Sequence, residues 1–223
     1  MIPLELLDTA DLPDGGNLRL MRRGQDYMIL FGRNELMSSR LRGSEEALAT
    51  LAWERMKGHS RPHMLVGGLG MGFTLRAALG ILPGDAQITV GELVPKIVEW
   101  ARGPLAHLFS DSLDDPRVEI AVRDVYELIA GSRATYDAIL LDVDNGPDGL
   151  IHMANDRLYG PEGLGAAHAA LRSGGVLAIW SAYPDKAFHE RVRRAGFAVD
   201  EVKVRATGGR KGAHHVIWLG IKR

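Results

Sequence analysis

Three glycines at alternate positions mark a turn suited to holding a nucleotide. Gly68, Gly70 and Gly72 follow the short apolar run 63–67 and precede a helical pattern. Glycine permits a tight turn and lets backbone N–H groups approach a ligand closely, although glycines also serve ordinary strand-to-helix turns. The Gly-Lys-Ser/Thr ending of a phosphate-binding ATPase loop does not occur here. The loop therefore favours an adenosine-containing ligand over a triphosphate.

A carboxylate follows this loop at the spacing typical of a ribose contact. The apolar run 88–90 leads to Glu92, roughly 20 residues beyond Gly72. A carboxylate at the tip of a second strand can accept hydrogen bonds from both ribose hydroxyls. Glu92 therefore strengthens the prediction of a nucleoside site.

Two further strand ends also carry carboxylates. Asp124 follows the apolar run 118–122 and precedes a helical pattern, so it is either a helix N-cap, an adenine contact or both. Asp142 belongs to an apolar strand, where a carboxylate faces a cleft or destabilises the fold. Asp144 lies in a loop rich in Asp, Asn and Gly, a composition that also serves simply to turn the chain. Since ligands of open α/β sheets bind at the carboxyl ends of the strands, we expect these side chains to meet.

Other chemistries receive less support from the sequence. Asp142 and Asp144 together offer hard oxygen ligands, but the repeated ligands and distal Glu of a calcium loop do not follow, so we predict no metal site. The chain has no cysteine, no His-Glu-x-x-His pair and no Gly-x-Ser-x-Gly turn. His214 and His215 alternate in a predicted strand, so at most one of them faces any site. Trp180 and Tyr183 follow the fifth strand as either core residues or pocket walls.

Composition narrows the class of protein. The 223 residues include 27 basic and 28 acidic side chains, and a net charge of −1 argues against a dedicated nucleic-acid binder. No stretch approaches the roughly 20 apolar residues that cross a bilayer, and the N-terminus does not resemble a signal peptide. We expect a cytoplasmic protein that binds neither nucleic acid nor membrane.

The elements that must position these side chains fall into two parts. Residues 1–60 predict a small β-hairpin at 18–31, a third short strand at 34–38 and a linking helix that begins at Ser44. Residues 61–223 alternate strands and helices, which predicts an α/β cofactor-binding domain with a mostly parallel sheet. The expected strands are 63–67, 87–91, 117–122, 137–142 and 175–181, and the expected helices are 72–80, 94–102, 124–130, 155–172 and 185–195. The glycine-rich connector 205–213 is too short for a crossover helix, so strands 197–204 and 214–221 should pair antiparallel.

Several of these motifs, taken in order and spacing, resemble the spermidine synthase family, the polyamine aminopropyltransferases. The resemblance covers about residues 18–185 and is carried by segments 68–76, 115–118, 136–142 and 171–177 together with Glu92 and Asp124. It implies a Rossmann-like, class I S-adenosylmethionine-dependent methyltransferase fold. That fold has a mostly parallel seven-stranded sheet with a C-terminal antiparallel hairpin. The resemblance further implies a shortened N-terminal β domain and a homodimer.

The resemblance also implies roles for individual residues. The glycine loop, Gly68, Gly70, Met71 and Gly72, would hold the amino-acid or aminopropyl end of the cofactor. Glu92 would bind the ribose, Asp124 the adenine and Asp142 the attacking amine. Asp142 is then a general base or an anchor for the nucleophile, with Asp144 as the second catalytic carboxylate.

This chain departs from the family pattern at three places. Met71 replaces the aspartate of the family's glycine loop and cannot accept a strong hydrogen bond. The family's Asp-Ser-Ser-Asp-Pro stretch is reduced to the residues 142–147, and the acidic helix start at 44–50 has no tyrosine. We therefore expect methyl transfer from S-adenosylmethionine to a small-molecule acceptor. The alternatives are aminopropyl transfer from decarboxylated S-adenosylmethionine to a polyamine, and a non-catalytic nucleotide-binding dimer.

Overall fold

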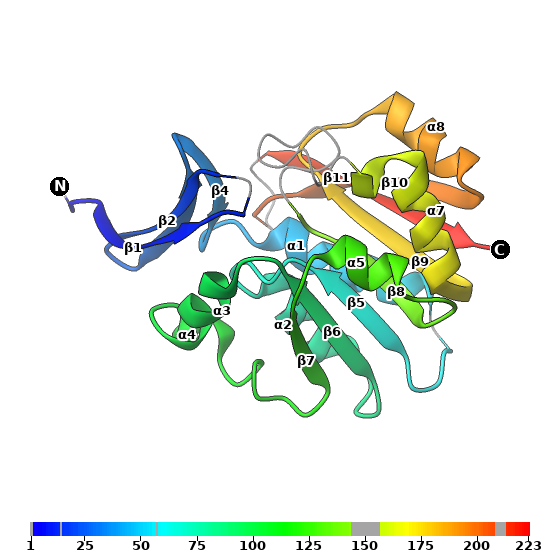
Figure 1. The fold of residues 1–223 in the computed structure, drawn as a ribbon, viewed down its shortest axis with the longest axis horizontal. Coiled ribbons are helices and arrows are strands. Elements are labelled where there is room, and N and C mark those ends of the chain that lie inside the picture. Colours follow the sequence, from blue (N-terminus) through cyan, green and yellow to red (C-terminus); the bar gives the residue numbers. More distant parts are fainter. Residues whose placement is uncertain (1, 14, 57, 144–156, 208–212) are drawn as a thin grey trace.

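The computed structural model describes residues 2–13, 15–56, 58–143, 157–207 and 213–223. In these residues the chain forms a small antiparallel sheet followed by a larger mixed α/β sheet (Figure 1). The small sheet, drawn in blue, stands beside the larger one and is joined to it through helix α1 (Gly43–Arg55). The predicted arrangement of an N-terminal β appendage before an α/β sheet is thus observed.

The N-terminal sheet has four strands rather than the three expected. Its order follows the chain, and every neighbouring pair is antiparallel. The strands are β1 (Glu5–Asp11), β2 (Asn17–Arg23), β3 (Asp26–Phe31) and β4 (Asn34–Ser38). Strand β1 was not predicted, because only one of its seven residues is buried and its sequence lacks an apolar alternation.

The larger sheet has seven strands and confirms the predicted fold class. Its order is β10-β11-β9-β8-β5-β6-β7, with the strands β5 to β9 parallel to one another and β11 antiparallel to both β9 and β10. The strands are β5 (His63–Gly67), β6 (Gln87–Glu92), β7 (Val118–Val122), β8 (Tyr136–Leu141), β9 (Leu171–Ser181), β10 (Phe197–Arg205) and β11 (His214–Lys222). The antiparallel pairing of β10 with β11 confirms the closing hairpin.

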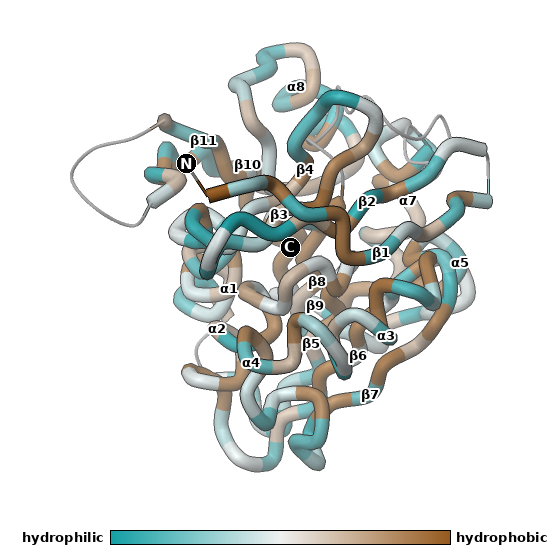
Figure 2. The backbone as a smooth tube through the Cα atoms, turned by 90° about the vertical axis from the view of Figure 1, so that its left-hand side faces the viewer, coloured by the Kyte–Doolittle hydropathy of each residue, from teal (hydrophilic) through white to brown (hydrophobic). Residues whose placement is uncertain are grey.

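Helices cover both faces of this sheet, and alternate side chains of each strand pack against opposite faces. On β5, Met64 and Val66 pack with α1 and α2 (Phe73–Ile81), whereas Leu65 packs on the other face with α5 (Val125–Ala130). Helices α7 (Pro161–Ala170) and α8 (Lys186–Arg194) also cover that second face. Figure 2 colours these central strands toward the hydrophobic end of the scale. Both faces of a parallel sheet are buried, which explains its continuous apolar runs.

Several boundaries differ from the sequence expectation. Helix α3 (Pro95–Arg102) is followed by an unpredicted short helix, α4 (Ala106–Phe109). The helix expected to reach residue 172 ends at Ala170, because the chain enters β9 at Leu171. None of the helices described in the structure is long and apolar enough to cross a membrane.

Candidate functional site

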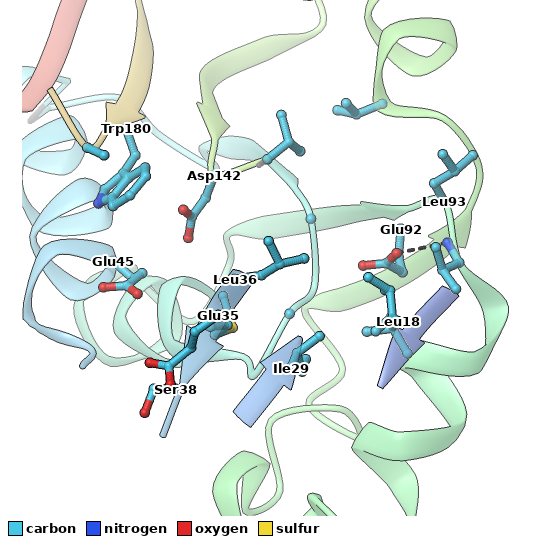
Figure 3. A pocket seen from close by; sticks show the side chains of 18 of the residues that line it. Leu18, Ile29, Glu35, Leu36, Ser38, Glu45, Glu92, Leu93, Asp142 and Trp180 are labelled. Atoms are coloured by element: carbon cyan, nitrogen blue, oxygen red, sulfur yellow. Dashed lines mark hydrogen bonds between the residues drawn. The ribbon is translucent and has the colours of Figure 1, made fainter. Parts of the chain in front are cut away.

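A cavity of about 570 Å³ opens where the strands of the larger sheet end, beneath the N-terminal sheet. Residues at or just after the carboxyl ends of β5, β6, β7 and β8 line one wall of it, among them Gly68, Glu92, Asp124 and Asp142. Side chains from the N-terminal sheet and its neighbouring turns form the opposite wall, including Leu18, Ile29, Glu35 and Leu36 (Figure 3). Its volume falls within the range of roughly 300 to 1,000 Å³ typical of small-molecule sites.

The glycine loop needs its glycines for conformation and for close packing. Gly68, Gly70 and Gly72 all have positive φ, at 90°, 49° and 78°. A Cβ on Gly68 would lie 3.0 Å from the carbonyl oxygen of Asp142, and one on Gly72 would lie 2.3 Å from the Phe109 ring. Gly68 and Gly70 line the cavity, whereas Gly72 precedes α2 and serves its packing. The loop therefore exposes backbone to the cavity at two of the predicted positions.

The side chain of Met71 lies in the hydrophobic core and does not line the cavity. Its backbone N–H donates to the sulfur of Met37 at 3.0 Å. Met37 comes from β4 and packs on the loop, since a Cβ on Gly70 would lie 2.8 Å from that same sulfur. The N-terminal sheet thus covers the loop at the point where the resemblance places a carboxylate.

Glu92 is buried and fixes the loops on both sides of it. One carboxylate oxygen accepts from Leu69 N at 2.9 Å, and the other accepts from Val94 N at 2.8 Å. Burial raises the pKa of Glu92, and the hydrogen bonds from backbone N–H groups oppose that rise. Backbone N–H groups of Gly70 and Leu93 also bond to this carboxylate, so the two loops hold it firmly at the cavity wall.

Asp124 is a helix N-cap, one of the two roles that the sequence left open, and it also lies at the cavity, while its contact with adenine stays a prediction. It caps α5, where its Oδ1 accepts from Tyr126 N at 2.8 Å, and it also lines the cavity. Its Oδ2 is paired with Arg157, whose guanidinium lies 4.2 Å from the centroid of the Tyr126 ring. Asp124 is therefore fixed from two sides at the cavity edge.

Asp142 lies directly after β8 and lines the cavity, as expected. Thr74 donates its hydroxyl to Asp142 Oδ2 at 3.0 Å. Burial raises the pKa of Asp142 to about 6, with the Thr74 hydrogen bond acting in the opposite direction. The predicted partner Asp144 lies outside the described residues, so the structure places only one of the two expected catalytic carboxylates.

A second buried carboxylate, Glu45, was not predicted as a site residue. It lies in the first turn of α1, lines the cavity and is only 8% exposed. Ser44 Oγ lies 2.8 Å from its Oε2. Burial raises the pKa of Glu45 to about 7, and the nearby charge of Asp142 adds to that rise. Two carboxylates thus share one part of the cavity.

The spacing of the apolar residues in α1 indicates that Glu45 is buried. Its buried side includes Leu48, Ala49 and Ala52, which lie three, four and seven positions after Glu45. A carboxylate at that position points with the apolar face rather than to solvent, while its neighbour Glu46 is exposed. An acidic residue that lies on the apolar face of a predicted helix can therefore be named as a candidate site residue from the sequence pattern of the helix alone.

The charges that line the cavity are of one sign. Five carboxylates contribute to it, and no Lys or Arg is among its described lining residues. Figure 3 shows Asp142, Glu45 and Trp180 on one side of the cavity, with Glu92, Leu93 and Leu18 on the other. The side around Glu45 and Asp142 is suited to a cation. The described residues contain no cluster of three or more His, Cys, Asp or Glu side chains placed to hold a metal ion.

Aromatic side chains complete the wall near these carboxylates. Trp180 is 8% exposed and meets the ring of His215 edge-on, with a centroid distance of 4.7 Å. Tyr183 lines the cavity too but is 75% exposed, so it lies at the rim. Both tryptophan and tyrosine therefore line the cavity, one in its wall and one at its mouth.

Comparison with known proteins gives a consistent set of relatives. No family model matches the chain. A polyamine aminopropyltransferase of Mycobacterium tuberculosis (strain H37Rv) is 31% identical over 159 residues, which is 67% of this chain and 29% of that protein. Polyamine aminopropyltransferase 2 of Pseudomonas aeruginosa is 31% identical over 144 residues, 61% of this chain and 39% of that protein. The chain thus spans well under half the length of these curated relatives.

Solved structures agree on the fold. A spermidine synthase in complex with the transition-state analogue AdoDATO superposes with a TM-score of 0.78 at 18% identity, covering 98% of this chain and 72% of that one. Spermidine synthase from Thermotoga maritima gives a TM-score of 0.76 at 19% identity, covering 98% and 73%. At these identities the likeness shows the shared fold alone.

Proposed function

The chain belongs to the spermidine synthase family, and from this premise we propose that it transfers an aminopropyl group from decarboxylated S-adenosylmethionine to an amine acceptor. The relatives named polyamine aminopropyltransferases favour this alternative over the methyl transfer expected first from the sequence. We further propose a small polyamine as the acceptor and a homodimer as the assembly.

The acidic half of the cavity is the observation that carries this proposal. Glu45 and Asp142 face the same space, and no cation of the described lining residues neutralises them. An ammonium group there would relieve the cost of two buried charges, because an opposite charge favours their ionised forms. The carboxylate of S-adenosylmethionine would instead meet repulsion in this half. The decarboxylated donor and an amine acceptor are therefore the better match in charge.

We assign the remaining contacts from the positions of the side chains. Glu92 would accept from the ribose hydroxyls, Asp124 would contact the adenine, and the backbone at Gly68 and Gly70 would border the sulfonium end of the donor. Met71 leaves the glycine loop without the family's carboxylate, and Glu45 of the acidic helix start supplies a carboxylate to the same cavity.

The reaction needs little chemistry from the protein beyond position and proton removal. The donor carries a propylamine chain on a positively charged sulfur. The acceptor nitrogen forms a bond to the carbon on that sulfur, the carbon–sulfur bond breaks with its electron pair returning to sulfur, and the nitrogen gives up one proton. Holding two reactants in line supplies much of the acceleration of such a step.

Thermal unfolding with candidate ligands tests the choice of donor. A ligand that binds only the native state raises the unfolding midpoint. Decarboxylated S-adenosylmethionine and methylthioadenosine should raise it more than S-adenosylmethionine or NAD at equal concentrations. Glu92→Ala should remove the shift, while Glu127→Ala, an exposed carboxylate of α5, should retain it. A larger shift with S-adenosylmethionine than with its decarboxylated form would return the assignment to methyl transfer.

A further inference from the structure

Resting on the proposed function, we propose that His215 of β11 takes up the proton that the acceptor amine loses, with Ser44 and Glu45 holding its imidazole in the required tautomer. His215 lines the cavity on the side of Glu45 and Trp180. It comes from the last strand of the chain, 171 positions after Ser44, and only the folded sheet brings the two together.

A chain of two hydrogen bonds fixes the imidazole. Nδ1 of His215 lies 2.9 Å from Ser44 Oγ, and that oxygen lies 2.8 Å from Glu45 Oε2. An ionised carboxylate only accepts, so the Ser44 hydroxyl donates to Glu45. Ser44 Oγ then accepts from Nδ1–H of His215. The second ring nitrogen, Nε2, is left with a lone pair.

The free nitrogen has no hydrogen-bond partner among the described residues of the structure. Burial lowers the pKa of His215, which keeps the imidazole neutral and able to accept a proton near pH 7. The Trp180 ring of β9 packs against the imidazole of His215, and Val204 of β10 is the residue paired with His215 in the sheet. A neutral imidazole with one oriented lone pair is the usual form of a general base.

The charged groups around this histidine set its response to pH. Glu45 of α1, Asp142 after β8 and Glu35 of β4 line the same cavity, and no Lys or Arg joins them among the described lining residues. With Glu45 protonated, its carboxyl group can donate to Ser44 and the direction of the chain can reverse, which would place a proton on Nε2. The arrangement therefore works as a proton acceptor above the pKa of Glu45, which lies at about 7.

The proposed role of His215 follows from the proton that the acceptor amine must lose. An amine that arrives as an ammonium ion must lose one proton before its nitrogen has a lone pair for the propyl carbon. That proton moves to Nε2, the nitrogen–carbon bond forms, and the carbon–sulfur electron pair returns to sulfur. His215 then releases the proton to solvent, so charge and atoms balance over one cycle.

Replacement of His215 and of its neighbour tests the assignment. His215→Gln keeps a donor for Ser44 but removes the basic nitrogen, so kcat at pH 8 should fall by about 100-fold with KM changed by less than about threefold. The rising limb of the pH–rate profile should move to higher pH, and added imidazole should restore part of the activity of His215→Ala. His214→Gln is the matched control, because His214 is exposed and does not line the cavity. An unchanged kcat and pH profile in His215→Gln would overturn the proposal.

A measurement on the free protein separates this proposal from the proposed function. Two-bond ¹⁵N–¹H spectra of the ligand-free protein at pH 8 should show His215 protonated at Nδ1, and Ser44→Ala should shift it toward a mixture of tautomers. Protonation at Nε2 would overturn the proposal whatever the enzyme does. If the wild type shows the expected tautomer but transfers no aminopropyl group to any amine tried, the proposed function fails and this assignment fails with it.

Discussion

Glu45 and Asp142 are two buried carboxylates in one cavity, and the charge of Asp142 makes ionisation of Glu45 harder. An empty site therefore stores an unfavourable charge at neutral pH that a bound cation would relieve. The sequence identifies these two carboxylates in different ways. Asp142 follows from its strand end, whereas Glu45 needs the observation that it lies in register with an apolar helix face.

The pH dependence of stability follows from the raised pKa of Glu45. Its pKa is about 7 in the folded protein against an ordinary 4.5, so the folded state binds this proton more tightly. The resulting stabilisation is complete below about pH 4.5 and is lost as pH rises through about 7. Glu45→Gln should therefore stabilise the ligand-free protein at pH 8, on the order of 2 kcal/mol, and have little effect at pH 4.5.

Unfolding curves of wild type and variant across this pH range check the prediction. Glu46→Gln serves as the control, because Glu46 is the exposed neighbour on the same helix turn, pairs with Arg42 at the surface and makes the smallest contribution to the raised pKa of Glu45. Equal midpoints for Glu45→Gln and wild type at pH 8 would be inconsistent with a destabilising charge at Glu45.

Asp142→Asn tests the second carboxylate. The amide keeps the size of the side chain and can still accept from Thr74, but it removes the negative charge that would hold the acceptor amine. Steady-state kinetics should show a loss of about 100-fold in kcat/KM for the amine. The thermal shift produced by methylthioadenosine should persist, since that ligand lacks the amine. Loss of both readouts would point instead to a collapsed site.

At the scale of elements, the amino end of β8 is fixed by a buried carboxylate. Asp137 is 3% exposed in its side chain, and its Oδ2 accepts from His63 N at 2.8 Å and from Arg172 Nη1 at 2.6 Å. His59 Nδ1 lies 2.9 Å from its Oδ1. One side chain thus links β8 to the starts of β5 and β9, on the opposite edge of the sheet from the cavity.

Removing this charge should destabilise the fold without touching the site. Asp137→Asn removes the charge of a buried carboxylate and weakens its pair with Arg172, whose side chain is 44% exposed. The change is expected to cost about 2 kcal/mol and to lower the unfolding midpoint by roughly 6 °C. Asp200→Asn is the comparison, because its pair with Arg55 is exposed and should be worth less than about 1 kcal/mol. Similar unfolding midpoints for the two variants would show that burial of Asp137 adds little to the stability of the fold.

The alternation of strands and helices after residue 61 could be predicted because each strand is a short apolar run between polar turns. Strand β1 could not, since it is nearly all exposed and its pairing with β2 rests on backbone hydrogen bonds rather than on a sequence pattern. The end of α7 was misjudged for a related reason. The apolar residues continue from Ala170 into Leu171, so hydropathy does not mark the change from helix to strand.

At the scale of the whole molecule, the cavity exists only because two sheets enclose it. Leu18 and Ile29 of the small sheet face the strand ends of the large one, and Met37 covers the glycine loop. Sequence patterns place carboxylates at strand ends within one sheet, yet they do not say which face of a separate hairpin covers them. This is why the apolar wall of the site was missing from the expectation.

The proposed homodimer has a candidate surface in the edge strand β1. Leu6 of β1 is 56% exposed and Leu4, just before the strand, is 41% exposed, and β1 is an outer strand of the described four-stranded sheet. Light scattering at micromolar concentration should report a dimer, and Leu6→Lys should give a monomer, because a lysine on an edge strand opposes pairing. Val122→Lys, on the edge strand β7, should leave the dimer intact. A monomeric wild type would contradict this assignment.

The identity of the transferred group is tested most directly by the mass of the product. The purified chain is incubated with one diamine and equal concentrations of S-adenosylmethionine and its decarboxylated form. We predict that the diamine gains one aminopropyl group, that methylthioadenosine accumulates in equal amount, and that Asp142→Asn forms far less of both. A diamine that gains a methyl group instead, with release of S-adenosylhomocysteine, would contradict aminopropyl transfer.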